Sequence, residues 1–336
     1  MNVVCDWPPY SRGEYSGRDL WMNGAGVRTD FERNAYMNYK NITVAGTGIL
    51  GSQIAYQTAY KGFHVNVYDV SEEVLRHARE RLTNLKENYK EDLGATQQAV
   101  DEAFNRLSFY TNLAQAVADA DLVIEAIPEV VQIKTDFYKE LGKVAPKKTI
   151  FATNSSTLLP SQFAEATGRP DKFLALHFAN SIWKNTTAEV MKHPGTDETV
   201  FRDVIEFAKA IGMVALPLQK EQPGYILNSL LIPLLEAAQM LLLKEVADVE
   251  TIDKTWMIAT GAPEGPFAIL DTVGIPTAYN ITLARANATG SPEFEKMASL
   301  LKTQYLDKGK LGRVTGQGFY TYPNPSFASP GFVRNR

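Results

Sequence analysis

One short segment, a strand followed by a glycine-rich turn and a helix, constrains the fold of this chain most strongly. The segment "NITVAG", 41–46, is rich in β-branched and apolar side chains, and "SQIAYQTAYKGF" after the turn has the spacing of an amphipathic helix. A second β-branched segment, "HVNVYD" at 64–69, follows that helix. Three glycines in the spacing G-x-G-x-x-G, Gly46, Gly48 and Gly51, stand between the first strand and the helix. This context predicts a strand–helix–strand unit of a parallel sheet.

The glycine-rich turn has the properties of a dinucleotide site. Gly46 allows a tight turn, Gly48 lets the backbone approach a pyrophosphate, and Gly51 lets the helix pack on the strand. The first N–H groups of the helix then face the anion, so the expected binding loop consists of Gly46, Gly48, Ile49, Leu50 and Gly51. Asp69 ends the second strand, where a carboxylate accepts hydrogen bonds from a ribose diol and repels a 2′-phosphate. No arginine follows directly, so the expected cofactor is NAD (NADH) rather than NADP.

Further apolar segments alternate with helical patterns along the first two thirds of the chain. Such alternation is typical of a parallel sheet that helices cover on both faces. We expect strands at 120–127, 148–156, 172–178 and 213–217, with helices such as 131–144 and 197–212. Helices at 71–94 and about 95–106 form an insertion. The expected architecture over residues 38–218 is an α/β, Rossmann-like NAD-binding domain with a mostly parallel sheet and a helical insertion.

The rest of the chain is predicted to be all-α. The segment "LQKEQPG", 218–224, is expected to be a linker, and helical patterns punctuated by Gly and Pro follow it. These helices are expected at 225–244, 248–260, 265–272, 275–287 and 292–307. They would form a C-terminal helical substrate and dimerisation domain over 224–323. Residues 1–36 contain turn formers without a helical or strand period, and an irregular extension is expected there.

The charge and the cysteine content exclude several classes of function. Over 336 residues the formal net charge is −4, which argues against a protein that binds nucleic acid through phosphate contacts. Cys5 is the only cysteine, so we expect neither a disulfide framework nor a metal site, and a reducing, cytoplasmic location fits. No charged segment followed by an apolar one opens the chain, so no secretory signal is expected.

The longest apolar stretch, 226–243, approaches the length of a membrane span. Asn228, Pro233 and Glu236 interrupt it, and a charged residue at a bilayer centre costs about 3 kcal/mol. We therefore expect a helix buried in a core or in a subunit interface rather than in a membrane. Asn228 is unusual in such a helix, since a buried amide without a partner costs about 1–3 kcal/mol, and we expect it to face a polar site.

Polar side chains collect where the predicted strands end. Glu129, Ser156 and His177 lie at or just after the carboxyl ends of strands, and ligands of such sheets bind beyond those ends. Glu189 comes soon after His177. A carboxylate bonded to one ring N–H fixes the tautomer and stabilises imidazolium, so the other ring nitrogen can exchange a proton with a carbonyl or alcohol oxygen. The alternatives to a catalytic role are that His177 only makes structural hydrogen bonds with its neighbours and that Ser156 only caps a helix.

Ordered sequence blocks run from about residue 41 to residue 323. They are "VAGTGILGSQIA", "ADLVIEAIPE", "ATNSSTLLPS", "FLALHFAN", "GYILNSLLIPLLEAA", "IDKTWMIATGAPEGPFAILDTVGI" and "GRVTGQGFYTYP". Together they resemble the 3-hydroxyacyl-CoA dehydrogenase family. The resemblance implies a catalytic His–Glu pair and two polar groups that hold the carbonyl oxygen, at His177, Glu189, Ser156 and Asn228. It implies cofactor contacts at Glu129, Lys134, Ser156 and Asn180, a homodimer formed through the C-terminal domain, and an S alcohol as the reduced product.

Two features bear on the substrate. The segments "FATNSSTLLPS" and "DKFLALHFAN" are most similar to the bacterial diketoreductase branch, whose substrates are 3,5-dicarbonyl esters. The segment after them departs from the usual family pattern, because Ser181 replaces a proline and Trp183 appears. The Ser and Lys that contact CoA in the family fall near Leu85 and Asp92, and an aspartate there opposes a CoA phosphate. The expected activity is NAD-dependent reduction of β-keto or 3,5-diketo esters to S alcohols.

Other functions remain open at this stage. The first alternative is an L-3-hydroxyacyl-CoA dehydrogenase that acts on 3-hydroxybutyryl-CoA in fatty acid metabolism. Carnitine and gulonate dehydrogenases share the implied architecture, and a crystallin-like nucleotide-binding structural protein is a rival of a different class. The expected partners are a small keto or hydroxy substrate, with a CoA thioester as the alternative, and a second copy of the chain. Neither nucleic acid nor a membrane is an expected partner.

Overall fold

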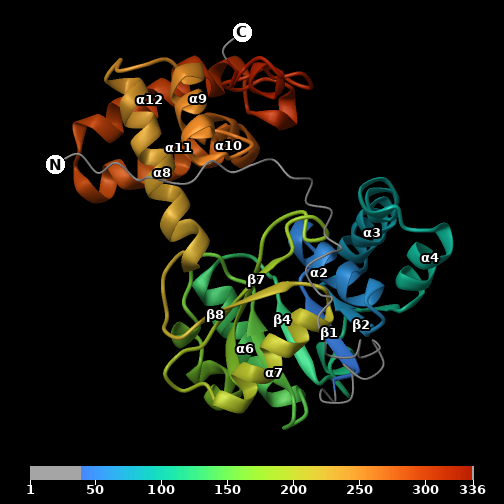
Figure 1. Cartoon of the computed structure of the whole chain (residues 1–336). Helices are drawn as coiled ribbons and strands as arrows, with labels where there is room; N and C mark the ends of the chain where they lie inside the picture. The colour runs from blue at the N-terminus through green and yellow to red at the C-terminus, as the bar shows by residue number, and fades with distance from the viewer. Residues whose placement is uncertain (1–38, 335–336) are drawn as a thin grey trace, which may run out of the picture.

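The computed structural model describes residues 39–334, and the extension expected over residues 1–36 lies outside the described residues. One sheet of eight strands lies at the centre of the first domain, in the order β3-β2-β1-β4-β5-β6-β7-β8 (Figure 1). The strands are β1 Asn41–Ala45, β2 His64–Tyr68, β3 Leu107–Tyr110, β4 Leu122–Glu125, β5 Ile150–Thr153, β6 Phe173–Phe178, β7 Thr187–Met191 and β8 Val214–Leu218. The first six are parallel to one another, which confirms the mostly parallel Rossmann-like sheet.

The far edge of the sheet differs from the prediction. The sequence patterns miss β3 and β7, and the strand predicted at 213–217 does not continue the parallel series. β7 runs antiparallel to β6, and β8 pairs parallel with β7, so both oppose β1 to β6. The connection between β6 and β7 is the short loop 179–186, which cannot provide the long crossover that a parallel neighbour needs. This reversal brings the start of β7 beside the end of β6.

Helices cover both faces of the sheet. They are α2 Ile49–Tyr60, α3 Glu72–Leu93, α4 Gln97–Asn105, α5 Leu113–Ala116, α6 Val131–Val144 and α7 Glu198–Ala210. One apolar cluster joins α2, α4 and α7 to strand residues such as Val44, and a second joins α5 and α6 to residues such as Val123. Successive side chains of a strand point to opposite faces, so strands covered on both sides are apolar throughout.

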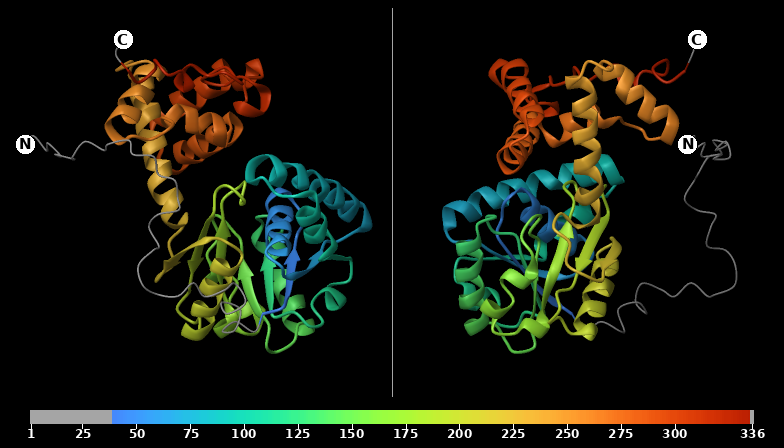
Figure 2. Two further views of the ribbon diagram at one scale, coloured as in Figure 1. Left: turned by 45° about the vertical axis from the view of Figure 1, so that its right-hand side comes forward. Right: turned by 90° about the vertical axis from the view of Figure 1, so that its left-hand side faces the viewer.

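The predicted helical insertion is present as α3 and α4. Ser71 caps α3 by accepting a hydrogen bond from the Val74 N–H, and Gly94 ends the helix with a left-handed φ of 65°. Tyr89 is buried on the inner side of α3 and meets Tyr56 edge-on, with ring centroids 4.9 Å apart. Figure 2 shows α3 on the side of the sheet domain that faces the helical domain.

The C-terminal part is helical, as predicted. It contains α8 Tyr225–Leu243, α9 Val249–Thr260, α10 Pro266–Val273, α11 Ile275–Thr289 and α12 Pro292–Gln304. Side chains such as Phe267, Leu270 and Met297 form its own apolar core. The buried Asp253 accepts hydrogen bonds from the Phe267 and Ala268 N–H groups, so a carboxylate caps the start of α10.

α8 is the stem between the two domains (Figure 1). By length and composition it is apolar enough to cross a membrane, as are many core helices of soluble proteins. Only 17% of its most apolar 18-residue stretch is buried. Its buried residues are Tyr225, Leu235, Ala238 and Gln239. The expectation that this helix is buried in the core of one chain is therefore wrong. The expectation that a subunit interface buries the apolar side of α8 remains.

Candidate active site

The sheet register places His177 and Glu189 directly opposite each other. They are a cross-strand pair of β6 and β7, and the imidazole Nδ1 lies 3.0 Å from the carboxylate Oε2. Both residues are buried, with exposed fractions of 7% and 4%. The short antiparallel return from β6 to β7 therefore produces the histidine–carboxylate contact expected from the sequence.

Ser156 completes a chain of three polar groups. It follows β5, the neighbour of β6, and its Oγ lies 3.1 Å from the imidazole Nε2 of His177. With the proton on Nδ1 and the carboxylate accepting it, the neutral ring leaves Nε2 as the acceptor of the Ser156 O–H. Ser156 is half-buried, so this end of the chain reaches the space beyond the strand ends.

The second oxygen of Glu189 is held by the first turn of α8. Its Oε1 accepts hydrogen bonds from the Ile226 N–H at 2.9 Å and the Leu227 N–H at 3.0 Å. Burial alone would raise the pKa of Glu189, but the hydrogen bond with His177 and those from Leu227 and Ile226 outweigh it and lower the pKa below its ordinary value. Glu189 is consequently an anion at neutral pH, seated at the positive end of a helix.

The glycine-rich loop has the geometry that a dinucleotide site requires. Gly46 has φ +94°, and a Cβ there would lie 2.5 Å from the Ala126 carbonyl oxygen. A Cβ on Gly51 would lie 2.0 Å from the Gly46 oxygen, so the close approach of α2 to β1 excludes a side chain. Gly48 has open space beside it, with no atom within 4 Å of a built Cβ. The loop is thus packed on the inside and open on the outside, which fits a bound pyrophosphate.

Asp69 lies beside this loop. Its Oδ2 accepts hydrogen bonds from the Thr47 N–H at 2.8 Å and the Thr47 hydroxyl at 2.5 Å, and it is partly exposed. Ile49, at the start of α2, is 71% exposed, and Leu50 is half-buried. Arg81 of α3 donates to the Thr47 carbonyl oxygen at 2.7 Å and ties the insertion to the same loop.

Glu129 organises the neighbouring strand end. Its Oε1 accepts hydrogen bonds from the Ser155 hydroxyl and from the Thr157 N–H at 3.1 Å, and its Oε2 lies 3.3 Å from Lys134 Nζ. Burial would raise its pKa, but the Ser155 hydrogen bond and the Lys134 charge lower it to about 2. Lys134 itself is 1% exposed, and its ammonium group also pairs with the fully buried Glu125. In this structure Lys134 supports Glu129 from inside the protein.

The remaining predicted residues lie at the margin of the site. Asn180 is exposed in the loop after β6, where its carbonyl oxygen accepts from Asn185. Asn228 is half-buried in the first turn of α8, and its backbone N–H donates to the Gly224 carbonyl oxygen at 3.0 Å. Within residues 39–334, no hydrogen bond links the Asn228 amide to His177, and no group of three or more His, Cys, Asp or Glu side chains is placed to hold a metal ion.

The loop between β6 and β7 is tied to the helical insertion. Asp92, near the end of α3, accepts a hydrogen bond from Trp183 Nε1 at 2.8 Å and pairs with Lys184 Nζ at 2.8 Å. On its other side the loop donates the Ser181 N–H to Gln53 of α2 at 2.8 Å. Sequence reasoning notes Trp183 and Asp92 separately and misses their contact, because they lie far apart in the chain.

The arrangement favours proton exchange over nucleophilic attack by serine. A serine–histidine–carboxylate chain also occurs in hydrolases, but acyl transfer requires free N–H donors for the oxyanion. The N–H groups that follow Ser156 are engaged, because Thr157 donates to Glu129 and Leu158 donates to the Ser155 hydroxyl. The Nε2 atom and the Ser156 hydroxyl can instead bind one carbonyl oxygen together.

Comparison with known proteins gives consistent matches over the described domains. Residues 41–222 match the NAD binding domain of 3-hydroxyacyl-CoA dehydrogenase, and residues 224–322 match its C-terminal domain. The mitochondrial hydroxyacyl-coenzyme A dehydrogenase of Homo sapiens is 34% identical over 84% of this chain and 91% of its own length. A probable 3-hydroxybutyryl-CoA dehydrogenase of Bacillus subtilis is 33% identical over 85% of this chain and 98% of its own. A solved structure of a diketoreductase, described in terms of substrate-directed dual catalysis of dicarbonyl compounds, is 55% identical to this chain and has a TM-score of 0.81. The match covers 84% of this chain and 99% of the diketoreductase chain.

Proposed function

The chain belongs to the 3-hydroxyacyl-CoA dehydrogenase family of NAD-dependent dehydrogenases, and on that premise we propose that it reduces the 3-oxo group of β-keto or 3,5-diketo esters to S alcohols. The family confirms the predicted cofactor, NAD, and the predicted class of enzyme, an oxidoreductase acting on a hydroxyl group. The residues of the glycine-rich loop together with Asp69 would hold the dinucleotide. When bound, its reduced nicotinamide supplies the hydride.

The observation that carries the proposed mechanism is the hydrogen-bonded chain from Glu189 through His177 to Ser156. In the reductive direction the protonated Nε2 of His177 donates to the ketone oxygen as that oxygen gains charge. Glu189 stabilises the imidazolium beforehand and receives the Nδ1 hydrogen bond throughout, at 3.0 Å. Such acid–base help contributes about 10²–10⁴-fold to a rate. In the oxidative direction the neutral Nε2 removes the alcohol proton.

Ser156 and Asn228 are proposed to hold the substrate oxygen. The Ser156 hydroxyl is within hydrogen-bond distance of Nε2, so an oxygen placed beside both would be oriented before the proton moves. Asn228 stands in the first turn of α8, the turn whose Ile226 and Leu227 N–H groups bind Glu189. Glu129, which follows β4, and Asn180, which follows β6, are proposed to contact the nicotinamide half of the cofactor.

The preference for a free keto ester over a CoA thioester rests on the insertion. At the two positions where the family resemblance places CoA contacts, this chain has the buried Leu85 and the anionic Asp92. Asp92 is engaged by Trp183 and Lys184, and its charge would repel a phosphate. The diketoreductase at 55% identity supports the same preference. The 3-hydroxybutyryl-CoA activity remains the second candidate, because two relatives carry hydroxyacyl-CoA names at 33% and 34% identity.

A substrate comparison tests this choice. NADH oxidation is followed with a 3,5-diketo ester and, separately, with acetoacetyl-CoA at matched concentrations. We expect kcat/KM for the diketo ester to exceed that for the thioester by at least about tenfold. Equal values would contradict the preference, and the reverse order would favour the acyl-CoA dehydrogenase.

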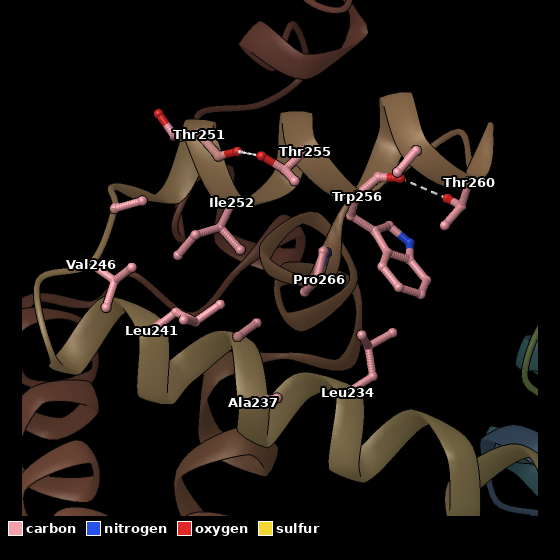
Figure 3. Close-up of a pocket in the computed structure, with 13 residues that line it drawn as sticks. Leu234, Ala237, Leu241, Val246, Thr251, Ile252, Thr255, Trp256, Thr260 and Pro266 are labelled. Atoms are coloured by element: carbon pink, nitrogen blue, oxygen red, sulfur yellow. Dashed lines mark hydrogen bonds between the residues drawn. The ribbon is translucent and has the colours of Figure 1, made fainter. Parts of the chain in front are cut away.

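A second copy of the chain is proposed to cover the apolar side of α8. A cavity of about 410 Å³ lies between α8 and α9, and Figure 3 shows Leu234, Leu241, Ile252 and Trp256 between the two helices. On α8, Leu230 is 70% exposed and Leu241 is 42% exposed, a pattern that an apolar partner surface would relieve. In a homodimer with two-fold symmetry, the same apolar surface of each copy is buried against the other.

The dimer is tested by light scattering after gel filtration. Leu241→Glu places a charge on the covered side and should shift the mass from two chains toward one. Val214→Glu, at an apolar position 57% exposed on β8, is the matched control and should leave the mass unchanged. A wild-type mass of one chain would contradict the proposal. We also propose a cytoplasmic location, which cell fractionation with an antibody against the chain tests.

A further inference from the structure

Tyr225 occupies a position that the proposed reaction leaves unexplained. It is the first residue of α8 and directly follows Gly224, and it is 1% exposed. Its side chain packs in a cluster with Ala175 of β6, Met191 of β7 and Leu218 of β8. The root of the helical domain therefore inserts an aromatic ring into the sheet domain, among the strands that carry the acid–base pair.

The ring of Tyr225 lies flat against the imidazole of His177. The two ring centroids are 4.4 Å apart and their planes differ by 15°. At its far end the Tyr225 hydroxyl donates to the carbonyl oxygen of Ser155 at 2.7 Å. Ser155 precedes Ser156, so one side chain contacts both His177 and the backbone that carries the hydroxyl partner of His177.

The imidazole needs a contact of this kind. The hydrogen bond to Glu189 holds the Nδ1 edge of the ring, and the remaining freedom of the side chain is rotation about its Cα–Cβ and Cβ–Cγ bonds. Nε2 can exchange a proton only when the ring plane points toward the substrate oxygen. A flat aromatic neighbour removes this rotation, and an aromatic face also attracts the imidazolium form.

The backbone at Tyr225 is in an unusual conformation. Its φ is 56°, in the left-handed region that residues with a side chain rarely adopt. The turn lets the Tyr225 side chain reach His177 while the N–H groups of Ile226 and Leu227 reach Glu189. The same helical turn therefore holds both members of the pair, and such strain persists where the surrounding structure enforces it.

We propose that Tyr225 is a positioning residue, whose ring holds the His177 imidazole so that Nε2 faces the substrate oxygen. The His177 base is then correctly oriented only while α8 is packed against the sheet domain. This inference rests on the proposed function, because only an acid–base role of His177 gives the ring orientation a consequence.

Two substitutions separate the ring from the hydroxyl. Tyr225→Phe keeps the stacked ring and removes the bond to Ser155, and we expect kcat to stay within about threefold of wild type. Tyr225→Leu removes the stacked ring, and we expect kcat to fall about 10- to 100-fold. The dissociation constant of NADH, measured by fluorescence, should change less than about twofold, since Tyr225 packs among β6, β7 and β8 and the glycine loop follows β1. Tyr305→Leu, a half-buried tyrosine of the helical domain, is the matched control and should keep wild-type kcat.

A spectroscopic measurement tests the stacking without turnover. The ring current of Tyr225 should move the His177 ring-proton resonances upfield, and the signal is assigned among the four histidines with His177→Gln. The displacement should persist in Tyr225→Phe and disappear in Tyr225→Leu. An undisplaced His177 resonance in the wild-type protein overturns the inference, even if the leucine variant does not fold.

The kinetic outcomes are equally decisive. A leucine variant with wild-type kcat, or a phenylalanine variant as slow as the leucine variant, overturns the positioning role of the ring. The proposed function fails separately, when the wild-type protein oxidises NADH with none of the keto substrates while the NMR displacement is still present.

Discussion

His177 and Glu189 are directly opposed residues of two antiparallel strands, β6 and β7. Side chains in such a position are neighbours because the Cβ atoms are only about 5 Å apart. The 3.0 Å contact between Nδ1 and Oε2 is thus set by the register of a sheet rather than by a loop. The Ile226 and Leu227 N–H groups fix the other carboxylate oxygen, so Glu189 can steer the imidazole without moving.

Replacing the carboxylate should impair catalysis without impairing cofactor binding. Glu189→Gln keeps the size of the side chain but removes the charge that stabilises imidazolium, so we expect kcat to fall about 10²-fold in steady-state assays. The NADH dissociation constant should stay near that of wild type. Glu198→Gln, which removes an exposed carboxylate paired with Lys192, is the control. A Glu189→Gln enzyme that keeps more than half the wild-type kcat would rule out the steering role.

Two glycines of the loop allow protein packing and cofactor binding to be tested separately. Gly51→Ala places a Cβ 2.0 Å from the Gly46 oxygen, and we expect a loss of about 1–3 kcal/mol in the free energy of unfolding together with weaker NADH binding. Gly48→Ala meets no protein atom within 4 Å, so the urea midpoint should be unchanged while NADH binding still weakens. Unchanged NADH affinity in Gly48→Ala would contradict the placement of the pyrophosphate.

The lowered pKa of Glu129 predicts that the free energy of unfolding depends on pH. Its folded-state pKa is lowered to about 2 from an ordinary value of 4.5, so its stabilising contribution is complete above the ordinary value and disappears as the pH falls through the folded-state pKa. Urea unfolding of wild type and Glu129→Gln should therefore differ most at about pH 6 and progressively less toward about pH 3. A difference that grows on acidification has the wrong sign and would contradict the network around Ser155 and Lys134.

Asp92 should control the loop that connects the two members of the pair. Asp92→Ala removes the acceptor of Trp183 and the partner of Lys184, and we expect kcat/KM for the diketo ester to fall by about tenfold as the loop loosens. Asp101→Asn removes another anion of the helical insertion, one that pairs with Lys86, and should leave kcat/KM unchanged. Equal effects of both substitutions would contradict the role of the loop and would point to the total charge of the insertion.

The strand ends and the glycine loop could be predicted from the sequence because they depend on local patterns. Apolar runs that alternate with helices place the ends of β5 and β6 together, and with them Ser156 and His177. β7 was not predicted because the segment before it is polar and because Thr187 and Glu189 interrupt its apolar residues. Without β7 the sequence could suggest that His177 and Glu189 meet, but it could not show the register that brings them together.

Other parts of the site depend on contacts that no local pattern reveals. Lys134 has the spacing of an ordinary surface helix residue, yet it is buried between Glu125 and Glu129. The left-handed backbone of Tyr225 is equally hidden in the sequence, since glycine is the residue that normally signals such a turn. These features arise when distant elements pack, and only the three-dimensional arrangement shows them.

The central claim is that His177 moves a proton in the step that transfers hydride to the keto carbon. A stopped-flow single turnover with excess enzyme, NADH and a 3,5-diketo ester measures that step directly through the loss of NADH absorbance. We predict that His177→Gln slows this transient by about 10²–10⁴-fold while NADH binds as tightly as in wild type. A variant that consumes NADH at the wild-type transient rate would contradict the mechanism.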